Sequence, residues 1–270
     1  MVNADIGSSR SEIRESESSL RVIITGASGG LGLALAHHYL GQGALVGVIA
    51  RSSDLLQSLL EKFPQNVLCY PLDVRDAVAL QAVAEDFIAR IGVPDIVIAN
   101  AGVSVGTLTE YAEDISAFQQ VMDINVLGML KTFQPFLVPM RHRGQGTLVG
   151  IASVAGFRGL PGAGAYSASK AAAISYLESL RVELHDSGVK VVTICPGYIK
   201  TPMTSSNPYR MPFILNADEA ASKIVRAIKR QAAFVVIPWQ MDIVARVLKI
   251  LPRWLYDRLF AGAPRKPRRV

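Results

Sequence analysis

Tyr166 and Lys170 are the residues whose types and spacing most directly suggest chemistry. They stand four positions apart, and residues at this spacing on a helix share one face, which places a phenol beside an ammonium. A phenol has a pKa of about 10, and a neighbouring positive charge lowers that pKa by favouring the ionised form. Such a tyrosine can exchange a proton with a carbonyl oxygen. Alone the pair is weak evidence, because the same spacing also occurs on exposed helix surfaces.

A glycine-rich turn follows the apolar, β-branched run Val22–Ile24. It reads Thr25, Gly26, Ala27, Ser28, Gly29, Gly30, Leu31, Gly32 and continues into an apolar stretch, which predicts a strand, a turn and a helix. Glycines allow a sharp turn and close approach to a pyrophosphate, and the free amides at a helix start bind anions. The spacing G-x-x-x-G-x-G differs from the G-x-G-x-x-G dinucleotide motif, so a plain surface turn is the alternative.

Together these motifs resemble the short-chain dehydrogenase/reductase superfamily, in its single-domain branch. Further family motifs follow in order, namely Asn100-Ala101-Gly102 after an apolar run, Asn125, Ser153 ahead of Tyr166, and Pro196-Gly197 followed by Thr201. The resemblance extends from about Ser19 to about Ala233. It implies an α/β fold, a Rossmann-type doubly wound parallel sheet with helices on both faces.

Composition and periodicity agree with one compact domain. The chain has 270 residues, of which 50% are hydrophobic and 19% charged. Helix-patterned segments alternate with strand-like runs at Arg21–Thr25, Ala44–Ile49, Val67–Pro71, Ile96–Asn100, Gly146–Ser153, Lys190–Ile194 and Phe234–Ile237. This alternation predicts a parallel sheet of about seven strands. We expect a disordered tail at 1–18, the domain at 19–238 and an extension at 239–270.

The resemblance implies a role for each catalytic residue. Tyr166 would be the general acid in reduction and the base in oxidation, while Lys170 lowers its pKa and reaches the nicotinamide ribose. Ser153 would hold the substrate oxygen near the phenol. Asn125 would organise a helix bend and a water that relays protons toward Lys170, with a purely structural role as the alternative.

The end of the second strand-like run predicts the choice of cofactor. Ala50 stands where NAD-dependent members of the family carry Asp, and Arg51 follows it, with Ser52 and Ser53 as further donors. A guanidinium suits a 2′-phosphate, so we expect NADP(H) rather than NAD(H), although Arg51 could also be an ordinary exposed arginine. Asp73 with Val74 resembles the adenine contact, with helix capping by Asp73 as the alternative.

The cofactor-binding positions implied by the resemblance are Gly26, Ser28, Gly29, Gly30, Leu31, Gly32, Arg51, Ser52, Asp73, Val74, Asn100, Ala101, Gly102, Tyr166, Lys170, Pro196, Gly197, Ile199 and Thr201.

The segment 201–215 resembles the family's substrate lid, and here it is apolar and rich in proline. Asn216 and Glu219 have the spacing of a capping box that starts the next helix. Candidate pocket residues are Ser104, Val105, Val154, Ala155, Phe157 and Tyr198, with Arg158 and Arg210 as the nearby charges. We therefore expect a carbonyl reductase or alcohol dehydrogenase for an apolar or lipid-like substrate. A catalytically silent NAD(P)-binding regulator of the same fold is the alternative.

Cysteine usage and the N-terminal sequence point to a cytoplasmic protein. Cys69 and Cys195 lie in apolar strand contexts, where buried reduced thiols are expected, and residues 1–20 contain no apolar core of a signal peptide. The four histidines are scattered, two in the first helix, His142 in a basic loop and His185 near a helix end, so no metal site is expected. The net charge of +6 comes with no nucleic-acid motif.

The extension at 239–270 is amphipathic and basic. Apolar residues follow a helical period in Trp239–Leu251, Pro252 interrupts it, and Arg253–Phe260 leads to a tail with Arg265, Lys266, Arg268 and Arg269. Such a segment could lie peripherally on the anionic inner face of a membrane. Packing on its own domain or on a partner subunit is the alternative. The family resemblance implies a homodimer or homotetramer.

Overall fold

The computed structural model describes residues 19–205 and 207–268, so the tail expected at 1–18 lies outside the described residues. The main sheet contains β1 (Arg21–Thr25), β2 (Leu45–Ala50), β3 (Val67–Pro71), β4 (Ile96–Ala99), β5 (Gly146–Ile151), β6 (Val189–Pro196) and β9 (Phe234–Ile237). The short strands β7 (Ile199–Lys200) and β8 (Leu215–Asn216) pair separately. The helices are α1 (Gly30–Leu40), α2 (Ser53–Lys62), α3 (Ala77–Ile91), α4 (Asp114–Met122), α5 (Gly128–Arg143), α6 (Gly164–Glu183), α7 (Pro202–Ser205), α8 (Ala217–Lys229), α9 (Trp239–Ile250) and α10 (Arg253–Phe260).

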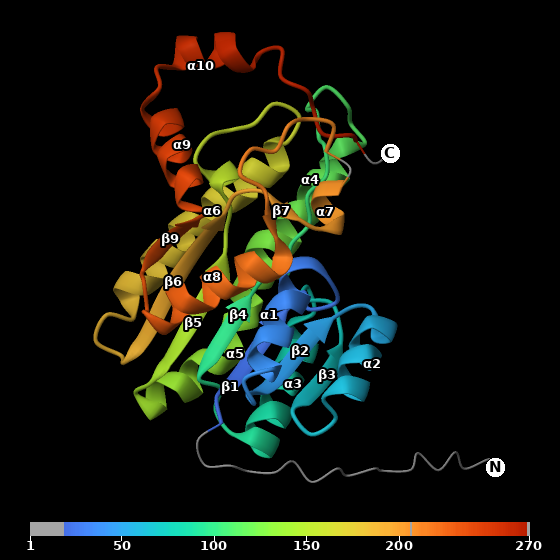
Figure 1. Cartoon of the computed structure of the whole chain (residues 1–270), viewed down its shortest axis with the longest axis vertical. Helices are drawn as coiled ribbons and strands as arrows, with labels where there is room; N and C mark the ends of the chain where they lie inside the picture. Colours follow the sequence, from blue (N-terminus) through green and yellow to red (C-terminus); the bar gives the residue numbers. More distant parts are fainter. Residues whose placement is uncertain (1–18, 206, 269–270) are drawn as a thin grey trace, which may run out of the picture.

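The main sheet is seven-stranded and its pairings are parallel, in the order β3-β2-β1-β4-β5-β6-β9 (Figure 1). The chain builds outward from β1 to β3, returns to place β4 on the other side of β1, and builds outward again. The strand order therefore reverses between β1 and β4, and doubly wound sheets bind their ligands at such a point, beyond the carboxyl ends of the strands. This confirms the expected fold class.

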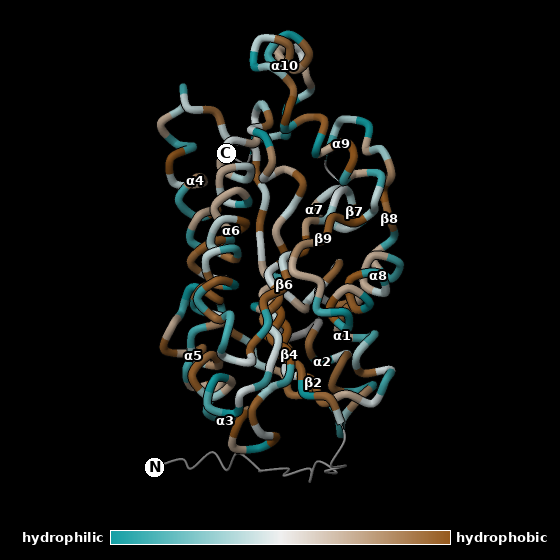
Figure 2. The backbone as a smooth tube through the Cα atoms, turned by 90° about the vertical axis from the view of Figure 1, so that its left-hand side faces the viewer, coloured by the Kyte–Doolittle hydropathy of each residue, from teal (hydrophilic) through white to brown (hydrophobic). Residues whose placement is uncertain are grey.

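Two apolar layers cover the two faces of the sheet. Because successive side chains of a strand point to opposite faces, Val22 and Ile24 belong to one layer and Ile23 to the other. The first layer includes residues of α1, α2 and α8, and the second includes residues of α3, α5 and α6. Figure 2 shows these helix groups on opposite sides of the strands. The burial of both faces accounts for the nearly unbroken apolar strand sequences.

Local details differ from the sequence prediction in several places, and some strand ends shift by one or two residues. β6 extends from Val189 to Pro196, because it pairs with β5 on one side and β9 on the other. Asn216 is the N-cap of α8, but its side chain makes no capping hydrogen bond, so the capping box does not form. His142 lies in the last turn of α5 rather than in a loop. Both cysteines are free, with Cys195 buried and Cys69 half-buried.

The C-terminal extension folds back onto its own domain. α9 continues from β9, α10 crosses the end of the molecule, and the last described residues run beside α4 and α7 (Figure 1). Tyr256 Oη donates to Gly159 O at 2.7 Å, and Arg158 Nη1 donates to Leu251 O at 3.2 Å. These contacts support packing on the same domain. Of the helices in the part of the chain that the structure describes, none has the length and apolar character needed to cross a bilayer.

Candidate active site

The glycine turn between β1 and α1 forms a tightly packed cradle at the switch point. Gly26 has a φ of 71°, which favours glycine, and a Cβ at Gly32 would overlap the Gly26 carbonyl oxygen and the Asn100 amide. Asn100 Nδ2 donates to Thr25 O at 3.0 Å and to Gly26 O at 3.2 Å. The end of β4 therefore holds the turn that follows β1.

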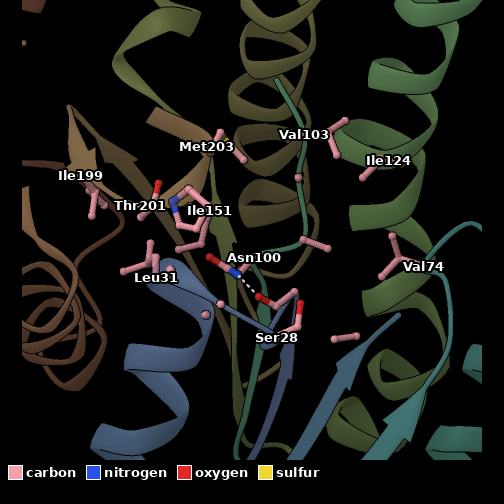
Figure 3. Close-up of a pocket in the computed structure, with 18 of the residues that line it drawn as sticks. Ser28, Leu31, Val74, Asn100, Val103, Ile124, Ile151, Ile199, Thr201 and Met203 are labelled. Atoms are coloured by element: carbon pink, nitrogen blue, oxygen red, sulfur yellow. Dashed lines mark hydrogen bonds between the residues drawn. The ribbon is translucent and has the colours of Figure 1, made fainter. Parts of the chain in front are cut away.

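A cavity of about 480 Å³ opens above this cradle, with side chains from both halves of the sheet pointing into it (Figure 3). It is lined by Gly26, Ser28, Gly29, Gly30, Leu31, Gly32, Arg51, Asp73, Val74, Asn100, Ala101, Gly102, Ser153, Tyr166, Lys170, Pro196, Gly197, Ile199 and Thr201, together with residues that the sequence did not single out. Of the proposed catalytic and cofactor positions, Ser52 and Asn125 are not among the residues lining the cavity.

Two charged residues, Arg51 and Asp73, line the cavity at the end nearest β2. Asp73 binds Arg75, with Arg75 Nη2 2.8 Å from Asp73 Oδ2, and this hydrogen bonding holds the pKa of Asp73 below its ordinary value, with a smaller contribution from the charge of Arg51. Asp73 does not cap a helix, because the N-cap of α3 is Asp76, whose carboxylate accepts from Ala79 N at 3.0 Å. Ser52 is the N-cap residue of α2.

The opposite wall brings Ser153, Tyr166 and Lys170 together. Ser153 follows β5, and its Oγ accepts from Ala155 N at 3.1 Å in the 3₁₀ turn Val154–Gly156. A Cβ at Gly156 would overlap the backbone of Lys170, so this glycine lets the turn pack directly on α6. The β5 end and the α6 face thus meet at the cavity.

Burial controls the protonation of this cluster. It raises the pKa of the Tyr166 phenol, opposed by a hydrogen bond with Ser153. Burial also lowers the pKa of Lys170 to about 8. The Lys170 Nζ donates to Ile151 O at 2.7 Å and lies 5.8 Å from the centroid of the Tyr166 ring. The two side chains share a helix face as expected, but the expected lowering of the tyrosine pKa by Lys170 is not found in this structure.

Asn125 lies behind the cavity wall in the π-helical turn Asp123–Leu127 and is fully buried. Its Oδ1 accepts from Val103 N at 2.8 Å, and its Nδ2 donates to Val103 O at 3.0 Å and to Ser169 Oγ at 2.9 Å. It therefore joins the loop after β4 to the catalytic helix α6. The π-helical turn interrupts the regular helix at Asn125, and these contacts give the residue a structural role.

The lid side of the cavity is formed by Pro202, Met203 and Thr204. Thr204 Oγ1 donates to Ile199 O at 2.7 Å, which fixes α7 against β7. The pocket candidates named from the sequence (Ser104, Val105, Val154, Ala155, Phe157 and Tyr198) are not among the lining residues. Arg158 instead binds the C-terminal extension, with its guanidinium carbon 4.2 Å from the centroid of the Tyr256 ring.

Sequence reasoning missed several apolar cavity residues, namely Ile49, Leu72, Val103, Ile124, Ile151 and Ala152. Most of them end a strand or directly follow one, so the carboxyl ends of the predicted strands could have identified them. It also missed Thr25, whose buried Oγ1 accepts from Asn100 N at 3.1 Å and from Ala101 N at 3.2 Å. Thr25 begins the glycine-rich motif, but the motif gives no sign that its hydroxyl binds the loop after β4.

Comparisons with known proteins agree with this geometry. The family model for short chain dehydrogenases matches residues 21–212. An uncharacterized oxidoreductase of Myxococcus xanthus is 39% identical over 238 residues, covering 87% of this chain and 94% of the relative. The NAD(+)-dependent 2-dehydro-3-deoxy-L-rhamnonate dehydrogenase of a Sphingomonas strain is 34% identical, covering 69% and 74%.

A short chain dehydrogenase of Burkholderia cenocepacia, solved in complex with NADP, has a similar structure with a TM-score of 0.77. It is 26% identical in sequence, and the match covers 89% of this chain and 98% of the other. With the motifs, the sheet order and the cavity, these matches establish the class: the chain belongs to the short-chain dehydrogenase/reductase family of oxidoreductases.

Proposed function

We propose that this chain transfers a hydride between NADP(H) and a carbonyl compound or secondary alcohol. The observation that carries the proposal is the presence of two complementary walls in one cavity. The glycine cradle and Arg51 lie on one side, and Ser153, Tyr166 and Lys170 lie on the other. The bound nicotinamide supplies or accepts the hydride, so the protein has to hold the carbonyl and move a proton.

The open side of the glycine cradle supports the binding of a dinucleotide. An added Cβ at Gly29 would meet open space, and the amides at the start of α1 would bind an anion there. Gly26 to Gly32 would hold the pyrophosphate, Lys170 the ribose beside the nicotinamide, and Ile199 with Thr201 the carboxamide. Arg51 lines the β2 end, where Ala50 supplies no carboxylate, and this favours the 2′-phosphate of NADP(H) over NAD(H).

The proton chemistry follows from the state of Tyr166. Its raised pKa keeps the phenol protonated at neutral pH, as a general acid for carbonyl reduction requires. The Ser153 hydroxyl orients the substrate oxygen toward the phenol, and Lys170 holds a positive charge below about pH 8. In the oxidation direction Tyr166 would accept the proton. A silent regulator would require none of these three groups, so the site does not favour that alternative.

The lining at the lid side favours an apolar substrate. Met203, Val103 and Ile151 line the cavity there, and charged lining residues other than Lys170 lie at the β2 end. A hydrophobic aldehyde or ketone matches this distribution. Oxidation of NADPH with a panel of aldehydes and ketones tests the proposal, and a protein that binds NADPH but reduces none of them would contradict it.

Self-association is part of the proposal. Ile115, Phe118, Leu127 and Leu130 are exposed apolar residues on α4, the π-helical turn and α5. These helices lie on one side of the sheet, and a second copy would cover their apolar side chains. We assign this face to the contact between two copies of the chain. The same contact serves in a homodimer or in a homotetramer. Sedimentation velocity measures the assembly.

We also propose peripheral binding to an anionic membrane through α9 and α10. Trp239, Ile243, Ile250 and Trp254 are 67%, 54%, 81% and 69% exposed. Exposed cations stand beside them at Lys249, Arg253 and Arg258. This combination of apolar surface and positive charge suits an anionic lipid interface. The tail contributes less positive charge to membrane binding than the sequence suggested, because Lys266 and Arg268 bind the protein itself.

A further inference from the structure

Residues 261–268, called the strap here, cross from the end of α10 to the start of α4 (Figure 1). The strap packs on the loop that follows β4, where Gly106 N donates to Pro267 O at 3.2 Å. A Cβ at Gly106 would overlap the carbonyl oxygens of Lys266 and Pro267. The two backbones therefore approach as closely as a glycine permits.

Arg268 fixes the end of the strap. Its Nε lies 2.8 Å from Asp114 Oδ2, and its Nη2 lies 3.1 Å from Asp114 Oδ1 and 2.9 Å from Glu113 Oε1. The guanidinium also stacks over the Tyr111 ring, 3.5 Å from the centroid. Asp114 is only 5% exposed, so this bidentate pair is more strongly held than a typical surface ion pair. The strap consequently has a defined position.

Lys266 lies between two elements that flank the substrate end of the cavity. Its Nζ donates to Ser104 Oγ at 3.0 Å and to Met203 O at 3.3 Å. Ser104 directly follows Val103, which lines the cavity, and Met203 lines it from α7. One ammonium thus joins the loop after β4 to the lid helix, and Figure 3 draws both Val103 and Met203 among the residues that line the cavity.

We propose that the strap is the outer wall of the substrate entrance. Lys266 is a positioning residue that sets the width of this entrance by tying Ser104 to Met203. The inference rests on the proposed function, which gives the entrance its substrate. Because the strap belongs to the same chain, each protomer completes its own entrance. Selection by substrate size depends on this tie, whereas binding of the cofactor at the glycine cradle does not.

Amide hydrogen exchange tests the tie without any substrate. Lys266→Met removes the ammonium and keeps most of the stem, Lys266→Arg keeps the charge, and Lys249→Met changes an exposed lysine on α9 as the matched control. We expect amide exchange in 103–108 and 202–205 to be roughly threefold to tenfold faster in Lys266→Met than in wild type. In Lys266→Arg the exchange rate should lie between these two values, and in the control it should equal that of wild type. Equal protection in all four proteins would overturn the proposal.

Kinetics with a small linear ketone and a bulky aryl ketone test the consequence. In Lys266→Met the ratio of kcat/KM for the bulky ketone to that for the small one should rise about threefold or more. NADPH affinity and kcat for the small ketone should stay at the wild-type values. Gly106→Ala displaces the strap from the opposite side. It should show the same faster amide exchange and the same rise in the kcat/KM ratio as Lys266→Met.

An unchanged ratio in both variants would contradict the role of the strap. A wild-type protein that reduces neither ketone would contradict the proposed function instead. The exchange experiment would still test whether Lys266 joins Ser104 to Met203, because it needs no substrate.

Discussion

The ammonium of Lys170 lies in the protein interior, bonded to the Ile151 carbonyl, and burial lowers its pKa from 10.5 to about 8. Between these values the unfolded chain binds more protons than the folded one, so this group makes stability rise with pH. Below about pH 8 the full penalty of burying the charge is present, and above about pH 10.5 it is absent.

Lys170→Met therefore changes how stability depends on pH. The stability of wild type relative to the variant should increase from pH 7 to above pH 10.5 by on the order of 3 kcal/mol. Chemical denaturation of both proteins across this range measures the difference, and contributions of groups that do not interact with Lys170 cancel. Parallel stability curves would show that Lys170 is not buried as a charged group.

Arg51→Ala tests the cofactor preference. Loss of the guanidinium should weaken NADPH binding by about 1.5–3 kcal/mol, the scale of a hydrogen bond to a charged group, and leave NADH binding nearly unchanged. Fluorescence titration with both cofactors measures this. A wild type that binds NADH as tightly as NADPH would refute the assignment.

At the residue scale, the sequence predicted the members of the site better than their interactions. Ser153, Tyr166 and Lys170 do meet at the cavity. The pKa shifts of Tyr166 and Lys170 could not be predicted, because they arise mainly from burial, which only folding creates. Ser52, which was expected in the site from its proximity to Arg51, is the N-cap residue of α2, and its side chain makes no capping hydrogen bond, so its role at the cofactor stays a prediction.

The strand, turn and helix at residues 21–40 form one unit, in which some glycines are needed for packing and others face the cavity. Gly32 packs against the Gly26 carbonyl and the Asn100 amide, whereas a Cβ at Gly29 would meet open space at the cavity. Gly32→Ala should lower the free energy of unfolding by about 1–3 kcal/mol through overpacking, and also weaken NADPH binding. Gly29→Ala should preserve stability and weaken only NADPH binding.

Thermal denaturation and NADPH titration of these two variants separate the tasks. Equal loss of stability in both would contradict the assignment of Gly29 to the ligand surface.

Element positions were largely predictable, because apolar β-branched runs and glycine turns are local signals. The π-helical turn at Asn125 is held by tertiary contacts, namely the bonds from Asn125 to Val103 and Ser169. Such contacts join residues far apart in the chain and leave no periodic pattern.

Across the whole molecule, α9 and α10 present the surface that we assign to lipid. Full-length protein should co-sediment with anionic vesicles at low salt and be released at high salt, because each nearby Lys or Arg contributes about 1 kcal/mol and that attraction is screened. The double variant Ile243→Glu, Ile250→Glu should lose binding. Val78→Glu on α3 is the matched control, since Val78 is 81% exposed.

Equal vesicle binding by the double variant and the control, or the absence of binding in wild type, would contradict the assignment of this surface to lipid. The sequence correctly indicated an amphipathic extension but left its packing open. The deciding contacts, Arg268 with Asp114 and Lys266 with Ser104, span more than 150 positions in the chain, and basic tail residues carry no signal of such partners.

The central claim is that Tyr166 delivers the proton during NADPH-dependent carbonyl reduction. The most direct measurement compares wild type and Tyr166→Phe for NADPH oxidation with a panel of aldehydes and ketones, alongside NADPH titration of both proteins. We predict turnover by the wild type, a loss of about 10²- to 10⁴-fold in the variant, and similar NADPH affinity in both. Near-normal turnover by Tyr166→Phe would contradict the account.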